Sequence, residues 1–275
     1  MLINFSKMHG LGNDFVVIDA INQTVQLNAE QIKRLADRHY GIGFDQLLLV
    51  KQAQSAADFR YVIYNADGTE VSQCGNGARC FALFVRQKGL TNKANIRVET
   101  GAGDLLLQVN DDQQVCVDMG EPIFAPSMVP LLFEQQKTTY SVNLSGNEIE
   151  FSALSMGNPH AVIQVADVAA ADVISLGAQL ENHSLFPERV NVGFSEIIDS
   201  SHIRLRVYER GAGETLACGS GACAAAVAGI QLGRVTSPVN VSLTGGDLTI
   251  EWLGEGYPVK MTGPANFVFD GMIKL

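Results

Sequence analysis

Two cysteines in this chain each stand directly before a Gly-x-Gly turn and an apolar run. The first lies in "SQCGNGARC" (72–80) and the second in "ACGSGAC" (217–223). Glycines at a helix start leave backbone N–H groups accessible, and the helix dipole makes that end positive, so it attracts a carboxylate. The same potential lowers the pKa of a thiol placed there. Each turn is therefore expected to combine a reactive sulfur with backbone N–H groups that can bind a carboxylate.

A pair of such turns suits proton transfer at the carbon next to a carboxylate. One sulfur would remove a proton from that carbon, and the other would deliver a proton from the opposite face. Without a cofactor, helix-end electrostatics must stabilise the carbanion. Cys74 and Cys218 are the candidate acid and base, and either could be the thiolate at rest. Cys80 and Cys223 fall inside the apolar runs and are expected in the core, and Cys116 in a strand.

The cysteine turns belong to an internal repeat. When Cys74 is aligned with Cys218, five further pairs coincide: Tyr64 with Tyr208, Glu70 with Glu214, Gly75 with Gly219, Gly77 with Gly221, and Gly89 with Gly233. Upstream, "GNDFVVID" (12–19) resembles "GNPHAVIQ" (157–164), and "GFDQLLLV" (43–50) resembles "GFSEIIDS" (193–200). Since the blocks recur in the same order, the chain is expected to be two homologous domains. The expected boundaries are 1–118 plus 264–275 for the first domain and 119–263 for the second.

The element pattern within each half predicts an α+β fold. Short β-rich stretches bounded by turn residues, such as "DFVVID", "QLLLV" and "YVIYN", are typical of strands. A helix is predicted from the Asn28 cap to Gly41, with a counterpart around 168–180. The segments after the cysteines are apolar on nearly every side, so these helices must be enclosed. We expect each domain to be a curved, mostly antiparallel sheet around a central apolar helix, with the active site in the interdomain cleft.

Composition narrows the function classes. The chain has 275 residues, 47% of them hydrophobic, and a formal net charge of −10. That charge argues against nucleic-acid binding. No apolar run reaches the roughly 20 residues that span a membrane, and the N-terminus lacks secretory features, so no membrane association and a cytoplasmic location are expected. In such a reducing compartment the five cysteines should be thiols.

The motifs resemble those of the diaminopimelate epimerase family over essentially the whole chain. They are "KMHGLGNDF", "GFDQ", "NADGTEVSQCGNGARC", "SMGNPH", "ERVNVGF", "YERGAGETLACGSGAC" and "MTGPANFVFDG". The resemblance implies interconversion of LL- and meso-diaminopimelate in the synthesis of lysine and cell-wall precursors. It implies no pyridoxal phosphate or other cofactor, no metal, and a homodimer.

The same resemblance assigns roles to residues at matching positions. Cys74 and Cys218 would be the acid/base thiols, and His160 and Glu209 would help to set their protonation. Backbone amides would hold the reacting carboxylate, and side chains would bind the rest of the substrate, with Glu209 suited to an ammonium and Arg210 to a carboxylate. The implied substrate-binding set is Asn13, Gln46, Asn65, Gly75, Asn76, Asn158, Asn191, Glu209, Arg210, Gly219 and Ser220.

Other interpretations of these residues stay open. His160 could satisfy a turn, and Glu209 with Arg210 could form a surface ion pair. The chain could be another cofactor-independent racemase, of the proline or hydroxyproline type, or a two-domain binding protein with incidental thiols. Zinc binding by the four cysteines at the turns fits less well, because their C-x5-C and C-x4-C spacings differ from the C-x2-C of structural zinc sites.

Overall fold

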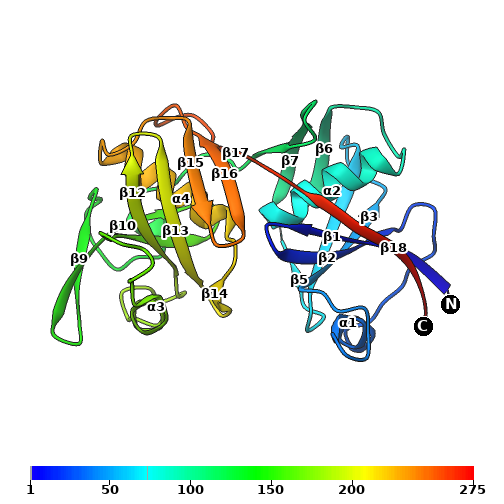
Figure 1. Cartoon of the computed structure of the whole chain (residues 1–275), viewed down its shortest axis with the longest axis horizontal. Coiled ribbons are helices and arrows are strands. Elements are labelled where there is room, and N and C mark those ends of the chain that lie inside the picture. Colours follow the sequence, from blue (N-terminus) through cyan, green and yellow to red (C-terminus); the bar gives the residue numbers. More distant parts are fainter. Residues whose placement is uncertain (1, 73) are drawn as a thin grey trace. The chain divides into compact units, whose positions relative to one another are not determined.

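The structure is a computed structural model that describes residues 2–72 and 74–275. The chain divides into two compact units, one formed by Met1–Asp118 with Thr262–Leu275 and the other by Met119–Met261. Figure 1 draws both units, coloured along the chain. The division leaves the C-terminal segment with the first unit. The sequence placed the second boundary two residues further on, after 263.

One mixed, mostly antiparallel sheet forms the first unit. Strands β18, β1 and β2 are antiparallel, β2 and β3 are parallel, β3 and β4 antiparallel, β4 and β6 parallel, and β6, β7 and β8 antiparallel. The short β5 pairs with β4. Their bounds are β1 (Leu2–Gly10), β2 (Asn13–Asp19), β3 (Gln46–Lys51), β4 (Phe59–Asn65), β5 (Glu70–Val71), β6 (Asn95–Thr100), β7 (Gly103–Val109), β8 (Val115–Asp118) and β18 (Asn266–Lys274).

The second unit repeats this pairing scheme. Strands β9, β10 and β11 are antiparallel, β11 and β12 parallel, β12 and β13 antiparallel, β13 and β15 parallel, and β15 and β16 antiparallel, with the short β14 on β13. The bounds are η1 (Pro126–Met128, a 3-10 turn), β9 (Tyr140–Leu144), β10 (Asn147–Ser155), β11 (Pro159–Gln164), β12 (Asn191–Asp199), β13 (His202–Glu209), β14 (Gly213–Thr215), β15 (Val239–Leu243) and β16 (Gly246–Glu251). The last short strand, β17 (Lys260–Gly263), crosses the boundary after Met261. The repeat inferred from the cysteine turns is therefore a repeat of whole sheets.

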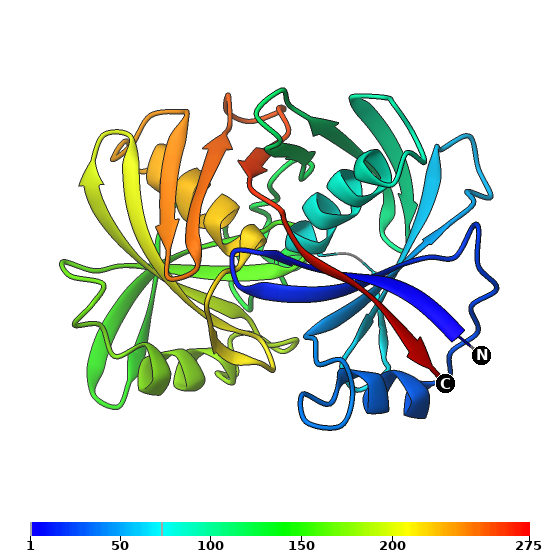
Figure 2. The ribbon, with the colours of Figure 1, turned by 45° about the vertical axis from the view of Figure 1, so that its right-hand side comes forward.

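A buried helix fills the centre of each sheet. Helix α2 (Gly75–Gln87) contacts β1, β2, β3, β7, β8 and β18, and α4 (Gly219–Gln231) contacts β10, β11, β12, β13, β15 and β16. All ten residues from Asn76 to Val85 are buried in α2, as expected for a helix without a polar face. Figure 2 shows the strands curving around both helices. The predicted α+β class, with two homologous domains, is confirmed.

Strand register corrects one of the sequence matches. Aligning Gly43 with Gly193 would make Leu47 equivalent to Ile197. In the structure Leu47 lies opposite Tyr64 on β4, and the residue opposite Tyr208 on β13 is Val192. That match was therefore wrong by five positions, because β-rich apolar runs can be aligned in several registers and only strand pairing selects one.

The corrected register shows which site residues are structural equivalents. Gln46 pairs with Phe15 on β2 as Asn191 pairs with His160 on β11. Gln46 and Asn191 therefore occupy the same place in the two units. By the same pairing, Asn65 at the end of β4 corresponds to Glu209 at the end of β13.

The two peripheral helices are shorter than predicted. Helix α1 (Ala29–Ala36) begins at the Asn28 cap, where Asn28 and Gln31 form a capping box, but ends before Asp37 rather than at Gly41. The Asp37 carboxylate accepts the N–H groups of His39 and Tyr40, which turns the chain out of the helix. Helix α3 (Val173–Glu181) begins at its Asp172 cap, so the residues from 168 to 172 are not helical.

The cysteines lie where their patterns indicated. None of the five forms a disulfide bond, Cys80 and Cys223 are fully buried in the central helices, and Cys116 lies in β8. Burial raises the pKa of Cys80 to about 12, as for a core thiol. No helix in the part of the chain that the structure describes is long and apolar enough to cross a membrane.

Candidate active site

Cys74 begins the central helix of the first unit. It is the N-cap of α2, and its carbonyl oxygen accepts hydrogen bonds from the Ala78 N–H at 2.8 Å and from the Tyr61 hydroxyl at 3.2 Å. Tyr61 also explains the glycine at position 77, since a Cβ there would lie 2.4 Å from the tyrosine oxygen. The Gly-x-Gly turn of this unit is thus packed directly against a buried tyrosine.

A tight hairpin brings Asn13 to the Cys74 sulfur. Leu11 and Gly12 connect β1 to β2 with φ values of 56° and 86°, the left-handed pair of a two-residue hairpin turn. Asn13 follows, and its Oδ1 lies 3.8 Å from Cys74 Sγ and accepts from Asn76 Nδ2 at 3.4 Å. Three of the predicted site residues of this unit are therefore in contact.

Gln46 and Asn65 form a second polar pair in the same unit. Gln46 Nε2 donates to Asn65 Oδ1 at 2.9 Å across β3 and β4. Gln46 Oε1 is buried and has no hydrogen-bond partner among residues 2–72 and 74–275. Leaving a buried acceptor unpaired costs about 1–3 kcal/mol, so this oxygen is a good place for a ligand donor such as an ammonium.

Cys218 begins α4 in the second unit and is more enclosed than Cys74. It is 4% exposed, its sulfur lies 3.7 Å from Ser220 Oγ, and it accepts the Gly221 N–H. Burial raises the pKa of Cys218 well above its ordinary value, and the Glu209 carboxylate raises it further, against the lowering effect of the Ser220 and Gly221 hydrogen bonds. The helix-start hydrogen bond from Gly221 lowers the pKa of Cys218 in the predicted direction, but burial and Glu209 outweigh it.

Glu209 shares a hydrogen bond with the Cys218 thiol. Burial raises the pKa of Glu209, while hydrogen bonds from Thr215 and Cys218 lower it. The Thr215 hydroxyl donates to Glu209 Oε1 at 2.5 Å. Because two acidic groups in contact titrate as a pair, Glu209 and Cys218 together retain a proton more readily than either would alone.

His160 is connected to Cys218 through two other side chains. Its Nε2 lies 3.0 Å from Asn158 Oδ1, and Asn158 Nδ2 donates to Ser220 Oγ at 3.3 Å, beside the sulfur. Burial, with the charge of Arg210, lowers the pKa of His160 to about 3, so the imidazole is neutral near pH 7. The neutral ring orients the Asn158 amide.

Asn191 and Arg210 are in contact in the same unit. Asn191 Nδ2 donates to the Pro159 carbonyl and Asn191 Oδ1 accepts the Arg210 N–H, so this buried amide braces two chain segments. The exposed Arg210 side chain donates from Nη1 to the Glu188 carbonyl at 3.0 Å. The exposed guanidinium, rather than the buried amide, is the group placed to meet a carboxylate.

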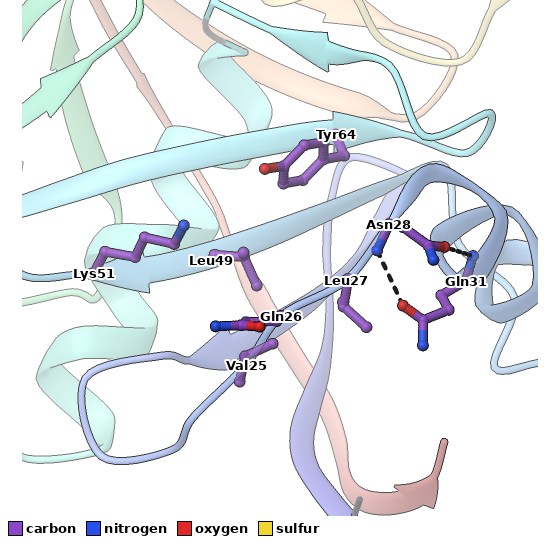
Figure 3. Close-up of a pocket in the computed structure, with 8 residues that line it drawn as sticks. All are labelled: Val25, Gln26, Leu27, Asn28, Gln31, Leu49, Lys51 and Tyr64. Atoms are coloured by element: carbon purple, nitrogen blue, oxygen red, sulfur yellow. Dashed lines mark hydrogen bonds between the residues drawn. The ribbon is translucent and has the colours of Figure 1, made fainter.

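A separate hollow lies on the first unit (Figure 3). It has a volume of about 480 Å³ and is lined by eight residues, all different from the predicted site residues: Val25, Gln26, Leu27, Asn28, Gln31, Leu49, Lys51 and Tyr64. Within residues 2–72 and 74–275, no group of three or more His, Cys, Asp or Glu side chains is arranged to hold a metal ion.

Comparison with known proteins identifies the family. The sequence profile of diaminopimelate epimerases matches residues 5–125 and 152–268. The chain is 57% identical over 275 residues to the diaminopimelate epimerase of Nitrosospira multiformis, covering 100% of this chain and 99% of that protein. The chain belongs to the diaminopimelate epimerase family. The enzyme of the same name from Nitrosomonas europaea is also 57% identical, with 100% of both chains covered.

Solved structures with the same fold extend beyond diaminopimelate epimerases. A hydroxyproline epimerase from Agrobacterium vitis matches with a TM-score of 0.70 at 15% identity, covering 99% of this chain and 92% of that one. A Bacillus anthracis phenazine biosynthesis protein of the PhzF family matches with a TM-score of 0.69 at 17% identity, with 100% of both chains covered. At these identities the likeness shows the fold alone.

Contacts inside this diaminopimelate epimerase family member add residues that sequence reasoning missed. Tyr61 holds the Cys74 carbonyl, Thr215 binds Glu209, and Asp45 accepts from the Asn13 amide at 3.1 Å. Asp45 lies in the "GFDQ" motif and Thr215 in "GETLACGSGAC", so motif membership was the available signal. Tyr61 carried none, because a tyrosine in an apolar strand is typical of any core.

Proposed function

We propose that this isomerase interconverts LL- and meso-diaminopimelate for lysine and cell-wall precursor synthesis, with Cys74 and Cys218 as the two proton-transferring groups. The observation that carries the proposal is the equivalent position of the two cysteines, each the N-cap of the buried helix at the centre of its sheet. Backbone N–H groups at both helix starts would bind the carboxylate next to the reacting carbon. The amides of Gly75, Asn76, Gly219 and Ser220 would supply this binding.

The proton balance follows from the different surroundings of the sulfurs. Burial and Glu209 favour the protonated form of Cys218. A reaction with one mobile proton then needs the other sulfur as thiolate, so Cys74 would take the α-proton in one direction while Cys218 gives its proton to the opposite face. Afterwards Cys74 is the thiol and Cys218 the thiolate, which is the starting state for the reverse direction. The helix-start amides would stabilise the intervening carbanion.

The remaining polar groups would bind the ends of the substrate. Gln46 Oε1, buried and unpaired among the described residues, suits an ammonium, as does the Glu209 carboxylate. The exposed guanidinium of Arg210 suits the distal carboxylate. Asn13, Asn65, Asn158 and Asn191 would act mainly by orienting their neighbours, since each already holds a side chain or backbone partner.

A cytoplasmic homodimer that needs no pyridoxal phosphate completes the proposal. Exposed apolar side chains on the C-terminal strand β18 support self-association: Phe267, Val268, Phe269 and Met272. Their exposure is unusual for a monomer surface strand and suits an isologous contact.

Proton NMR in heavy water tests the reaction. Purified protein with LL-diaminopimelate and no added cofactor should exchange the α-proton and produce the meso isomer, while proline in a parallel tube should stay unchanged. Cys74→Ala and Cys218→Ala should lose turnover by several orders of magnitude, because each removes one of the two proton carriers. Cys116→Ala, which removes a strand thiol, is the matched control and should retain activity. Exchange on proline alone, or full activity of Cys74→Ala, would exclude the proposal.

A further inference from the structure

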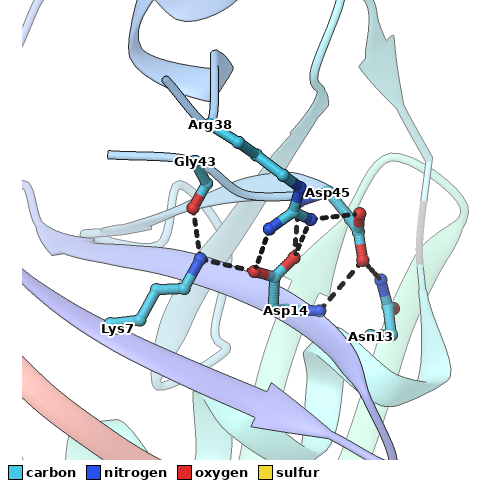
Figure 4. A network of polar contacts seen from close by, with 6 residues as sticks. All are labelled: Lys7, Asn13, Asp14, Arg38, Gly43 and Asp45. Atoms are coloured by element: carbon cyan, nitrogen blue, oxygen red, sulfur yellow. Dashed lines mark hydrogen bonds and ion pairs between the residues drawn. The ribbon is translucent and has the colours of Figure 1, made fainter. Parts of the chain in front are cut away.

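A charged network on the first unit ends at the Asn13 amide (Figure 4). Asp45 uses its two oxygens differently: Oδ1 accepts from Arg38 Nη2 at 2.9 Å, and Oδ2 accepts from Asn13 Nδ2 and the Asp14 N–H, both at 3.1 Å. Arg38 also forms two hydrogen bonds with the Asp14 carboxylate, at 2.8 and 2.9 Å, and Lys7 Nζ lies 2.6 Å from the same group. The ion pair between Arg38 and Asp14 therefore fixes the guanidinium that holds Asp45.

A buried arginine holds the other end of the same chain of contacts. Arg79 in α2 is fully buried, donating from Nη2 to Asn76 Oδ1 and from Nε to the Pro264 carbonyl, both at 3.0 Å. A guanidinium has donors only. Asn76 must therefore turn its oxygen toward Arg79 and its NH2 group toward Asn13.

These two ends decide which way the Asn13 amide faces. A carboxylate accepts hydrogen bonds only, so the Asn13 NH2 group must face Asp45. The Asn13 oxygen then faces Asn76 Nδ2 and, at 3.8 Å, the Cys74 sulfur. An amide oxygen beside the sulfur accepts S–H and disfavours a thiolate, whereas an NH2 group in its place would do the reverse.

We propose that Asp45 is a positioning residue for proton transfer, which orients Asn13 so that an acceptor rather than a donor faces the Cys74 sulfur. The oxygen would hold the S–H group of Cys74 in the half of the cycle in which this thiol donates. The inference rests on the proposed function for its effect on turnover, and on local geometry alone for its effect on the thiol.

Asp45→Asn is the sharpest perturbation, since it keeps size and leaves only one acceptor oxygen. The charged donor Arg38, anchored on Asp14, should claim that oxygen because charge-assisted hydrogen bonds are the stronger ones. The new NH2 group would then face the NH2 group of Asn13. The contacts that oppose a flip of Asn13 are long, 3.4 Å to Asn76 and 3.8 Å to Cys74, so the amide should rotate and present its NH2 group to the sulfur.

Alkylation of Cys74 by iodoacetamide, followed at the level of the peptide by mass spectrometry across a pH series, measures this rotation without any need for activity. In Asp45→Asn the midpoint should move down by about 0.5–1 pH unit, because the donor stabilises the thiolate and the charge of Asp45 is lost. In an Asn13→Ala background only the charge is lost, so the same substitution should move the midpoint less; a shift of equal size there would overturn the rotation. The other titratable or charged side chains around this turn include Tyr61, Arg79 and Cys80, which the variant leaves unchanged. Asp45→Glu, which still only accepts, should keep the parent midpoint.

Turnover supplies the second readout. In Asp45→Asn, kcat for diaminopimelate should fall about tenfold or more with a smaller change in KM, because misplacement at the reacting group costs rate more than binding. The matched control is Asp104→Asn, which breaks a partly exposed Asp–Arg pair with Arg97 elsewhere on the same unit. If Asp45→Asn matches Asp104→Asn in both readouts, Asp45 has no positioning role. An inactive parent with the expected alkylation shift would instead overturn the proposed function and leave the orientation of Asn13 established.

Discussion

Replacing Gly77 by alanine tests how the first turn of α2 is packed. The added Cβ would lie 2.4 Å from the Tyr61 oxygen, 3.2 Å from Phe15 Cε1 and 3.4 Å from Leu48 Cδ2. Tyr61 is buried and its hydroxyl is bound to the Cys74 carbonyl, so it cannot swing into solvent. The turn that carries Cys74 must move instead.

Two opposing effects determine how much local stability α2 loses in Gly77→Ala. Overpacking a core costs about 1–3 kcal/mol, and alanine in place of glycine inside a helix returns about 0.5–1 kcal/mol. Gly77→Ala should therefore lower the local stability of α2 by roughly 0–2.5 kcal/mol. Activity should fall by up to about 100-fold if the turn shifts by about 1 Å.

A double-mutant cycle with Tyr61→Phe identifies the clash. Removing the hydroxyl costs about 0.5–1.5 kcal/mol, and the Cys74 carbonyl keeps its bond from the Ala78 N–H. In the double variant the methyl group enters the vacated space, so the two losses should not add. The expected coupling is about 1–3 kcal/mol.

Hydrogen exchange of peptides covering α2 is the appropriate assay, because it reports local opening without assuming that both units unfold together. Gly221→Ala is the comparison, since a Cβ there meets Val207 Cγ2 at 3.1 Å and Cys218 Sγ at 3.2 Å, which is tight but less severe. Gly221→Ala should lower the free energy of local opening of α4 by less than Gly77→Ala lowers that of α2. Additive losses in the Gly77 and Tyr61 variants would refute the packing argument.

Two further predictions concern the second unit. Glu209→Gln should lower the pH at which iodoacetamide alkylates Cys218, because the carboxylate raises the pKa of that thiol; an unchanged midpoint by peptide mass spectrometry would mean that burial alone sets it. His160→Asn should lose less stability than the parent as the pH falls from 6.5 toward 3. The pKa of His160 is about 3 in the folded protein and near 6.5 in the unfolded chain. In the parent, the contribution of the neutral His160 to the free energy of unfolding is therefore present above pH 6.5 and is lost on acidification. Urea midpoints measured along the pH series will check this.

The sequence by itself determined the repeat, the α+β class and the position of both cysteines. These follow from local chemistry, since a Gly-x-Gly turn before an apolar run specifies a helix start, and an apolar run without a polar face specifies burial. The same reasoning placed the start of α1 at Asn28, where the capping box lies within four residues. It failed at the end of α1, where the Asp37 turn competed with the helical pattern.

Only the tertiary structure decided the electrostatics and the equivalence of the site residues. Whether the pKa of Cys218 falls at a helix start or rises through burial depends on Glu209, which β13 brings to the sulfur, and on the enclosure of the thiol. The match of Gln46 with Asn191 required strand register, because apolar β-runs can be aligned in several ways. The orientation of Asn13 by Asp45 and Asn76 depends on side chains that a hairpin, a loop and a helix bring together. Such contacts are non-local, and a linear pattern of residue types does not encode their distances.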